Sequence, residues 1–132
     1  MKVTLTMKPA ERSFIPIEAE SITPENFLSG TDLSVWRGNR EVKLDEIFSV
    51  SVEGTADQPE DVEVIIQGDD TFRLKRVGEY MDSGAIVILG DVGMHCGNFM
   101  SGGTIDIKGD AGSWLGREME GGTILCRGNA AN

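Results

Sequence analysis

The sequence has few of the residues that build metal sites and disulfide frameworks. It contains one histidine and two cysteines, Cys96 and Cys126. Zinc sites need several ligands at short spacings, and disulfide-stabilised domains need several cysteine pairs, so neither architecture is expected. No apolar run approaches the roughly 18 residues of a membrane span. The start, MKVTLTMKPA, alternates polar with apolar residues where a secretory signal needs an apolar block. We therefore expect a cytoplasmic protein with no membrane partner.

Basic residues are also scarce. Twelve Lys and Arg stand against 22 Asp and Glu, which gives a formal net charge of −10. A surface with this charge repels phosphate backbones, so nucleic acid is not expected as a partner. The length fits one domain, or one small domain with an appendage.

Glycine, in contrast, is abundant and periodic. Of 17 glycines, 13 follow Val77, and the chain from there divides into segments 78–96, 97–115 and 116–132. The repeat glycines form three columns with a 19-residue offset: Gly78, Gly97 and Gly116; Gly84, Gly103 and Gly122; Gly90, Gly109 and Gly128. A related strand at 64–69 precedes them with an offset of 22. Self-similarity at a fixed period indicates stacked structural repeats.

The repeat unit predicts the fold class. Each unit has a four-residue strand closed by glycine and then Asp or Asn, and it is too short to bury an apolar face alone. We predict a mainly β protein, a right-handed parallel β-helix (a single-stranded solenoid with 19-residue coils) with a small mixed α/β N-terminal segment. The predicted domains are 1–61, a capping segment, and 62–132, the repeats. Period-2 alternation predicts the inward residues Val64, Ile66, Ile86, Ile88, Ile105, Ile107, Ile124 and Cys126, and the outward residues Ile65, Val87, Asp106 and Leu125.

The N-terminal half has local signals of a different kind. Residues 2–7 alternate as a strand, and Thr23 followed by Pro24 and Glu25 predicts a short helix with Thr23 as its N-cap. Residues 44–48 fit a helical turn, and 54–61 a loop. We expect this half to cover the first repeat and part of one lateral face, where an open strand edge would recruit foreign strands.

Three groups of residues are candidates for chemical sites. Asp91, Asp110 and Asn129 form one column, which could bind calcium or serve a lyase, but side chains that close turns explain it better. His95 and Cys96 are adjacent and should face opposite sides, so a nucleophile pair is not expected, and Cys96 should be buried. The glycine-rich turns that begin at Gly90 and Gly109 lack the Lys-Ser/Thr of a phosphate loop. The sequence therefore predicts no catalytic, cofactor-binding or metal-binding residue in this chain.

Exposed apolar residues give a candidate interface. Trp36 and Trp114 are large aromatics, and Ile65, Val87 and Leu125 lie on the outer strand face. These five residues could anchor a partner protein. An equally good interpretation is that the N-terminal half of the chain covers these five residues.

The order of motifs resembles the C subunit of formylmethanofuran dehydrogenase. The motifs are ITPENF at 22–27, VWRGNR at 35–40, GDVGMH at 90–95 and the glycine repeats, and the resemblance covers residues 15–132. The repeats alone also resemble the GXGXG β-helix domain of the glutamate synthase large subunit. The first resemblance implies a scaffold role in an oxidoreductase complex of one-carbon metabolism, which reduces carbon dioxide and formylates methanofuran in methanogenesis or its reverse.

The same resemblance implies which cofactors and partners to expect. Molybdopterin or tungstopterin, iron–sulfur clusters and a dinuclear metal site belong to partner subunits, which are a pterin-binding chain and an amidohydrolase-like chain. No catalytic residue is carried over to this chain. Two alternatives stay open, a glutamate-synthase-like structural domain and a carbohydrate-active β-helix enzyme.

The end of the sequence adds an expectation about assembly. The chain stops at Asn132, where the next repeat should begin, which leaves the strand at 124–127 with an open apolar edge. A truncated sequence, a short natural subunit, or an edge capped by a partner or a second copy would each fit. We expect an oligomer.

Overall fold

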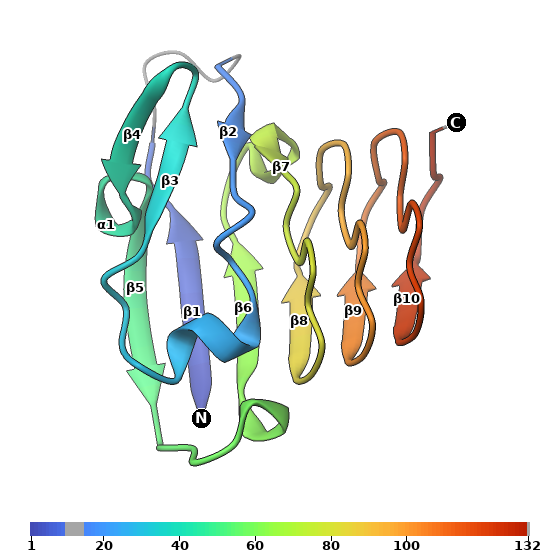
Figure 1. Cartoon of the computed structure of the whole chain (residues 1–132). Coiled ribbons are helices and arrows are strands. Elements are labelled where there is room, and N and C mark those ends of the chain that lie inside the picture. The colour runs from blue at the N-terminus through green and yellow to red at the C-terminus, as the bar shows by residue number, and fades with distance from the viewer. Residues whose placement is uncertain (10–14, 132) are drawn as a thin grey trace.

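The computed structural model describes residues 1–9 and 15–131, and it consists of two sheets joined by short helical turns (Figure 1). The six-stranded sheet has the order β10-β9-β8-β6-β1-β5, and the four-stranded sheet has the order β4-β3-β2-β7. The strands are β1 (Lys2–Met7), β2 (Ile17–Glu18), β3 (Ser34–Arg37), β4 (Arg40–Lys43), β5 (Phe48–Glu53), β6 (Glu63–Gln67), β7 (Leu74–Lys75), β8 (Ala85–Ile88), β9 (Thr104–Ile107) and β10 (Thr123–Cys126). The helical elements are η1 (Pro24–Phe27), α1 (Leu44–Ile47), η2 (Pro59–Asp61) and η3 (Thr71–Arg73).

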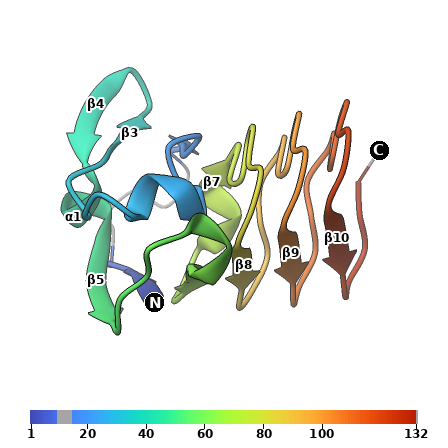
Figure 2. The ribbon, with the colours of Figure 1, turned by 60° about the horizontal axis from the view of Figure 1, so that its bottom comes forward.

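The repeats pair in parallel with the register that their period predicts. Ile105 on β9 lies opposite Ile86 on β8 and Ile124 on β10, which are offsets of 19 residues on both sides. Val64 on β6 pairs with Ile86, the predicted offset of 22. A second line of parallel bridges joins Val92, Ala111 and Ala130. Strands β8, β9 and β10 therefore follow one another at regular spacing, with the N-terminal elements at the far end (Figure 2).

The predicted strand faces are correct. Six of the eight predicted inward side chains are fully buried: Val64, Ile66, Ile86, Ile88, Ile105 and Ile107. Ile124 and Cys126 pack only partly against the core because β10 has a single strand neighbour among the described residues. The outward residues Ile65, Val87 and Asp106 are half-buried, and Leu125 is exposed. Period-2 alternation thus decides which side of the sheet each residue covers.

The N-terminal strand covers the first repeat by direct pairing. Strand β1 runs parallel to β6, with Val3 opposite Val64, and antiparallel to β5, with Val3 opposite Val52. Its alternate residues Val3 and Leu5 are fully buried. The expectation that this half covers the first repeat is confirmed for the edge of β6, which pairs with β1.

The four-stranded sheet is built around a two-residue hairpin. Strands β3 and β4 are antiparallel, with Arg37 opposite Arg40, and Gly38 occupies the first turn position with φ +61°. A positive φ there is typical of the tight turns that close hairpins. Strand β2 connects this hairpin to β7, pairing antiparallel with β3 and parallel with β7.

The short helices are located largely as predicted. Helix α1 at Leu44–Ile47 confirms the helical turn, and the loop at 54–61 contains the short η2. The helix after Thr23 is a 3₁₀ helix with Thr23 at its N-cap position, as predicted, but the Thr23 side chain makes no capping hydrogen bond. A four-residue 3₁₀ helix closes i to i+3 bonds and leaves fewer orphan donors for a cap.

The prediction of a mainly β, right-handed parallel β-helix is wrong as a fold class. The structure is a mixed α/β arrangement whose two sheets each combine parallel and antiparallel pairs, and the GXGXG β-helix assignment fails with it. The repeat pattern reports how β8, β9 and β10 pair with one another. It contains no information on the insertion of β1 between β5 and β6, or on the second sheet formed by β2, β3, β4 and β7.

One core serves both halves of the described chain. Val3 and Leu5 from β1, Phe27 from η1, and Ile86 and Ile105 from the repeats belong to the same cluster of buried residues. Among the described residues, no helix is long and apolar enough to cross a membrane.

Candidate functional site

The repeat glycines lie where one repeat contacts the next. In the first two columns all six glycines have positive φ: Gly78, Gly84, Gly97, Gly103, Gly116 and Gly122. At Gly103 (φ +82°) a Cβ atom would lie 2.7 Å from the carbonyl oxygen of Gly84. In the third column, a Cβ on Gly109 would lie 2.7 Å from the carbonyl carbon of Gly90. Close contact with the backbone of the preceding repeat therefore excludes a side chain at Gly103 and Gly109.

The column of Asp91, Asp110 and Asn129 links successive repeats at their turns. The backbone N–H of Asp110 donates to Oδ1 of Asp91 at 2.7 Å, and the N–H of Asn129 donates to Oδ1 of Asp110 at 2.8 Å. Each carboxylate thus accepts from the backbone of the following repeat, so the predicted side-chain ladder is confirmed, with bonds that join repeats. The described residues contain no group of three or more His, Cys, Asp or Glu side chains that could hold a metal ion.

His95 and Cys96 face different environments. Cys96 is buried, and burial together with the nearby Cys126 raises the pKa of its thiol to about 12. A thiol with this pKa is protonated at neutral pH, and the protonated form is a poor nucleophile. The His95 ring stacks on Trp114 with centroids 4.9 Å apart. Burial and the positive charge of Arg76 lower the pKa of His95.

Three of the predicted interface residues lie in one row across the outer face of the six-stranded sheet. The register places Thr4, Ile65, Val87, Asp106 and Leu125 side by side on successive strands. We call this row the outer-face row. Its last member, Leu125, is 47% exposed, which leaves an apolar side chain open to contact.

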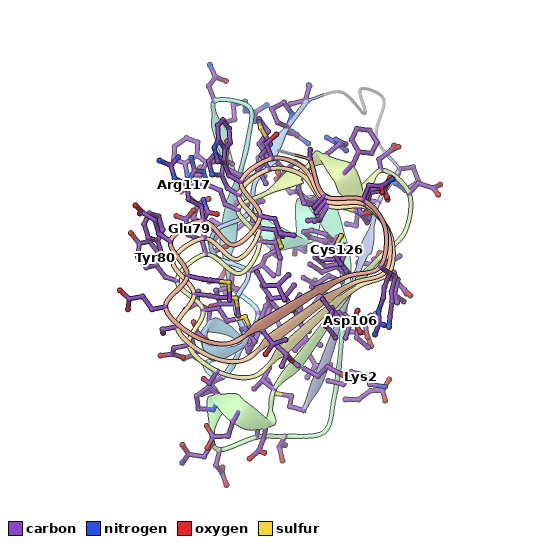
Figure 3. The ribbon with its side chains drawn as sticks, turned by 90° about the vertical axis from the view of Figure 1, so that its right-hand side faces the viewer. Lys2, Glu79, Tyr80, Asp106, Arg117 and Cys126 are labelled. Atoms are coloured by element: carbon purple, nitrogen blue, oxygen red, sulfur yellow. The ribbon has the colours of Figure 1, made fainter. Side chains whose placement is uncertain are left out.

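A cluster of charged side chains lies at the centre of this face. Asp106 accepts from Lys108 Nζ at 2.9 Å and from Arg127 Nε at 3.2 Å. These contacts hold the pKa of the Asp106 carboxyl below its usual value, with the hydrogen bond from Arg127 as the main cause. Asp106 and Lys2 point away from the stack on the same side, whereas Cys126 lies inside it (Figure 3).

A second surface follows the turns on the opposite side of the stack. Glu79, Tyr80 and Arg117 lie there, away from Asp106 (Figure 3). Two stacked ring pairs mark this turn edge: Tyr80 with Phe99 at 4.9 Å, and His95 with Trp114. Six residues in two 19-residue columns have positive φ there: Arg76, His95, Trp114, Tyr80, Phe99 and Glu118.

Hydrogen bonds between repeats compensate for the strained backbone of the turn edge. A left-handed conformation costs roughly 1–2 kcal/mol for a residue with a Cβ. The N–H of Tyr80 donates to the Asn98 carbonyl at 2.9 Å, and the N–H of Phe99 to the Arg117 carbonyl at 2.9 Å. The same conformation thus recurs because it directs each N–H toward the next repeat.

The structure separates the five predicted interface residues. Ile65, Val87 and Leu125 share the outer face, while Trp114, 49% exposed, belongs to the turn edge. Trp36, 41% exposed, lies on β3 of the four-stranded sheet. The stacking of Tyr80 on Phe99 was not predicted, although the 19-residue alignment places both residues in one column.

Comparisons with known proteins find relatives that are C subunits of formylmethanofuran dehydrogenases. No family model matches the chain. The C subunit of tungsten-containing formylmethanofuran dehydrogenase 2 from Methanothermobacter wolfeii is 40% identical over 98 residues, which are 70% of this chain and 36% of the relative. The C subunit of molybdenum-containing formylmethanofuran dehydrogenase 1 from Methanosarcina barkeri is 40% identical over 92 residues, 66% of this chain and 30% of the relative. The chain spans about a third of the length of these relatives.

A solved structure gives the same result for the fold. A chain in the crystal structure of the formyltransferase/hydrolase complex FhcABCD of Methylorubrum extorquens, in complex with methylofuran, matches 97% of this chain with a TM-score of 0.82 and 28% identity. The match covers 47% of that chain.

The fold and its surfaces define a mixed-sheet protein with a run of 19-residue strand repeats and exposed apolar side chains on two separate surfaces. Over the 98 and 92 aligned residues, the chain is homologous to C subunits of formylmethanofuran dehydrogenases.

Proposed function

We propose that this chain is a non-catalytic structural part of a formylmethanofuran dehydrogenase complex. Such a complex would reduce carbon dioxide and formylate methanofuran, or run in reverse. The observation that carries the proposal is the 40% identity to a named C subunit over 98 residues. The match to a chain of a formyltransferase/hydrolase complex supports the same assignment.

The partners in this proposal are a pterin-binding subunit and an amidohydrolase-like subunit. The names of the relatives contain tungsten or molybdenum, so a metal-containing cofactor fits a partner chain. The chemistry of this chain supports that division, because Cys96 is held protonated by burial and the oxygens of Asp91 and Asp110 accept backbone hydrogen bonds.

The outer-face row and the turn edge are the surfaces proposed for docking. Hot spots of protein interfaces are rich in aromatic anchors and surrounded by polar residues. On the outer-face row, the apolar side chain of Leu125 lies beside the polar cluster around Asp106. On the turn edge, Trp114 supplies an aromatic anchor. The division into a capping segment at 1–61 and repeats at 62–132 remains part of this proposal.

Co-purification tests the proposed assembly. The chain would be tagged in its native cell, pulled down gently, and the co-eluting chains identified by mass spectrometry. We expect an amidohydrolase-like chain and a pterin-binding chain in stoichiometric amounts. An eluate that contains only this chain, or an amidotransferase in place of these two, contradicts the proposal.

Point variants test the outer face within the same experiment. Leu125→Asp and Val87→Asp place a carboxylate in the outer-face row and should reduce recovery of a partner that docks there. Phe72→Asp is the matched control, because Phe72 is 51% exposed and lies in η3, outside the sheet strands. Equal recovery with all three variants would exclude the outer face as a docking surface.

A further inference from the structure

An open cleft of about 520 Å³ lies away from the repeats, beside the hairpin. Five separate parts of the chain line it: the end of β1, the residues before β2, the β3–β4 turn, α1 and η3. A volume of this size is within the range of small-molecule sites. We call it the basic cleft.

The charge of the basic cleft is opposite to that of the chain. Lys8, Arg37, Arg40 and Arg73 line it, against the single carboxylate of Glu46 among its described lining residues. These are four of the 12 basic residues in a chain with a net charge of −10. A concentration of cations in an acidic protein creates a local positive potential that attracts anions.

Of the four cations in the cleft, Arg73 is the one that a bound anion would stabilise most. Its side chain lines the cleft, although the residue is only 5% exposed. Its Nε donates to the carbonyl oxygen of Ile15 at 2.9 Å, and this is the one hydrogen bond that the guanidinium makes to the described residues. A guanidinium has five N–H donors, so the described residues leave further donors of Arg73 without a partner. Burial lowers the pKa of Arg73, Asp70 opposes this effect, and Arg37 adds repulsion.

The fold fixes the other cations near Arg73. Arg37 and Arg40 face each other across the hairpin turn, and the N–H of Gly38 donates to the carbonyl of Pro16 at 3.0 Å. The N–H of Lys8 donates to the Ile47 carbonyl at 2.9 Å, and its ammonium donates to the Asp45 carbonyl. That carbonyl is uncharged, so the positive charge of Lys8 is not neutralised by it.

We propose that the basic cleft binds a small polyanion with phosphate or carboxylate oxygens, held by Arg73 and Arg37, with Arg40 and Lys8 at the rim. Arginine forks match these oxygens with paired hydrogen bonds, and the anion neutralises a charge that is otherwise buried. The site is independent of the proposed structural role and of the outer-face row.

Calorimetric titration of the purified full chain tests the proposal. Pyrophosphate and citrate serve as probes for the phosphate and carboxylate classes, with chloride at equal ionic strength as the reference. We expect saturable binding of at least one probe, and the tighter probe identifies the class. Arg37→Gln combined with Arg40→Gln should raise Kd about tenfold or more, since each hydrogen bond to a charged group contributes substantially to affinity.

Two further variants make the test specific. Arg73→Lys keeps the charge but removes the fork, so Kd should rise while circular dichroism shows an intact fold. Arg127→Gln, in an exposed ion pair on the six-stranded sheet, should leave Kd unchanged. The proposal is overturned if neither probe binds saturably, if the Arg37/Arg40 double variant binds as tightly as the unsubstituted chain, or if Arg127→Gln weakens binding equally.

Discussion

Truncation of Ile105 probes the packing of the repeats most directly. Ile105 is fully buried on β9, between Ile86 on β8 and Ile124 on β10. Its Cδ1 methyl group lies close to Gly78, whose position has no side chain to move into a gap. Ile105→Ala should therefore leave a cavity that the surroundings fill poorly.

The expected loss is large for a protein of this size. Isoleucine to alanine in a core costs about 2–5 kcal/mol, and the value increases with the residual cavity. The glycine neighbours favour the upper half of that range. A chain of this length loses about 4 °C in Tm per kcal/mol, so Tm should fall by about 8–20 °C. A total stability of about 10 kcal/mol, the middle of the usual range of about 5–15 kcal/mol, would leave the variant folded at room temperature.

Thermal and urea unfolding monitored by circular dichroism measure this effect. The adjacent Asp106→Ala is the matched control, because its side chain faces outward and its ion pairs with Lys108 and Arg127 are exposed to water. Its Tm should shift by only a small fraction of the change in Ile105→Ala. Comparable losses in both variants would refute the assigned faces and the shared core.

Three other predictions concern the glycine columns, a half-buried acid and the thiols. Gly103→Ala forces an alanine into φ +82° against the carbonyl of Gly84, and should destabilise by more than the roughly 1–2 kcal/mol of backbone strain alone. Burial, with the nearby negative charge of an aspartate, raises the pKa of Glu25 above 4.5. The native state therefore binds the Glu25 proton more tightly than the unfolded state does, and the stability of the fold increases as pH falls through the folded pKa. Glu25→Gln should therefore raise Tm at pH 7, with a smaller gain near pH 4. A thiol reagent should modify half-buried Cys126 well before Cys96, whose pKa is about 12, with both reacting in urea.

Each of these three has its own control. Gly30→Ala adds a side chain at φ +128° with open space around it, so its difference from Gly103→Ala isolates the contact with the neighbouring repeat. Glu20→Gln removes one charge at an exposed position, and an equal rise in Tm at pH 7 would show that net charge, not burial, is responsible. Faster modification of Cys96 than of Cys126 in the native chain would contradict its burial.

The sequence was a good guide wherever one repeat determines the next. Identical residues at a fixed period leave one parallel register, and the alternation of polar with apolar residues leaves one choice of faces, so Ile105 and Asp106 could be assigned without coordinates. Burial of Cys96 and the turn role of Asp91 follow from the same columns. The stacked rings of Tyr80 and Phe99 were available from this alignment as well.

Everything that depends on contacts between unlike segments needed the tertiary structure. The alternation in β1 fits a parallel or an antiparallel neighbour, and β1 has both, which makes the sheet mixed and overturned the predicted fold class. The placement of Trp114 and Leu125 on different surfaces, and the meeting of Lys8, Arg37 and Arg73 in one cleft, result from the path of the chain in space. Local patterns specify pairing between copies of the same segment, because each copy has the same partners. Contacts between different segments are not repeated along the sequence, so no periodic pattern predicts them. They are determined only by how the whole chain folds.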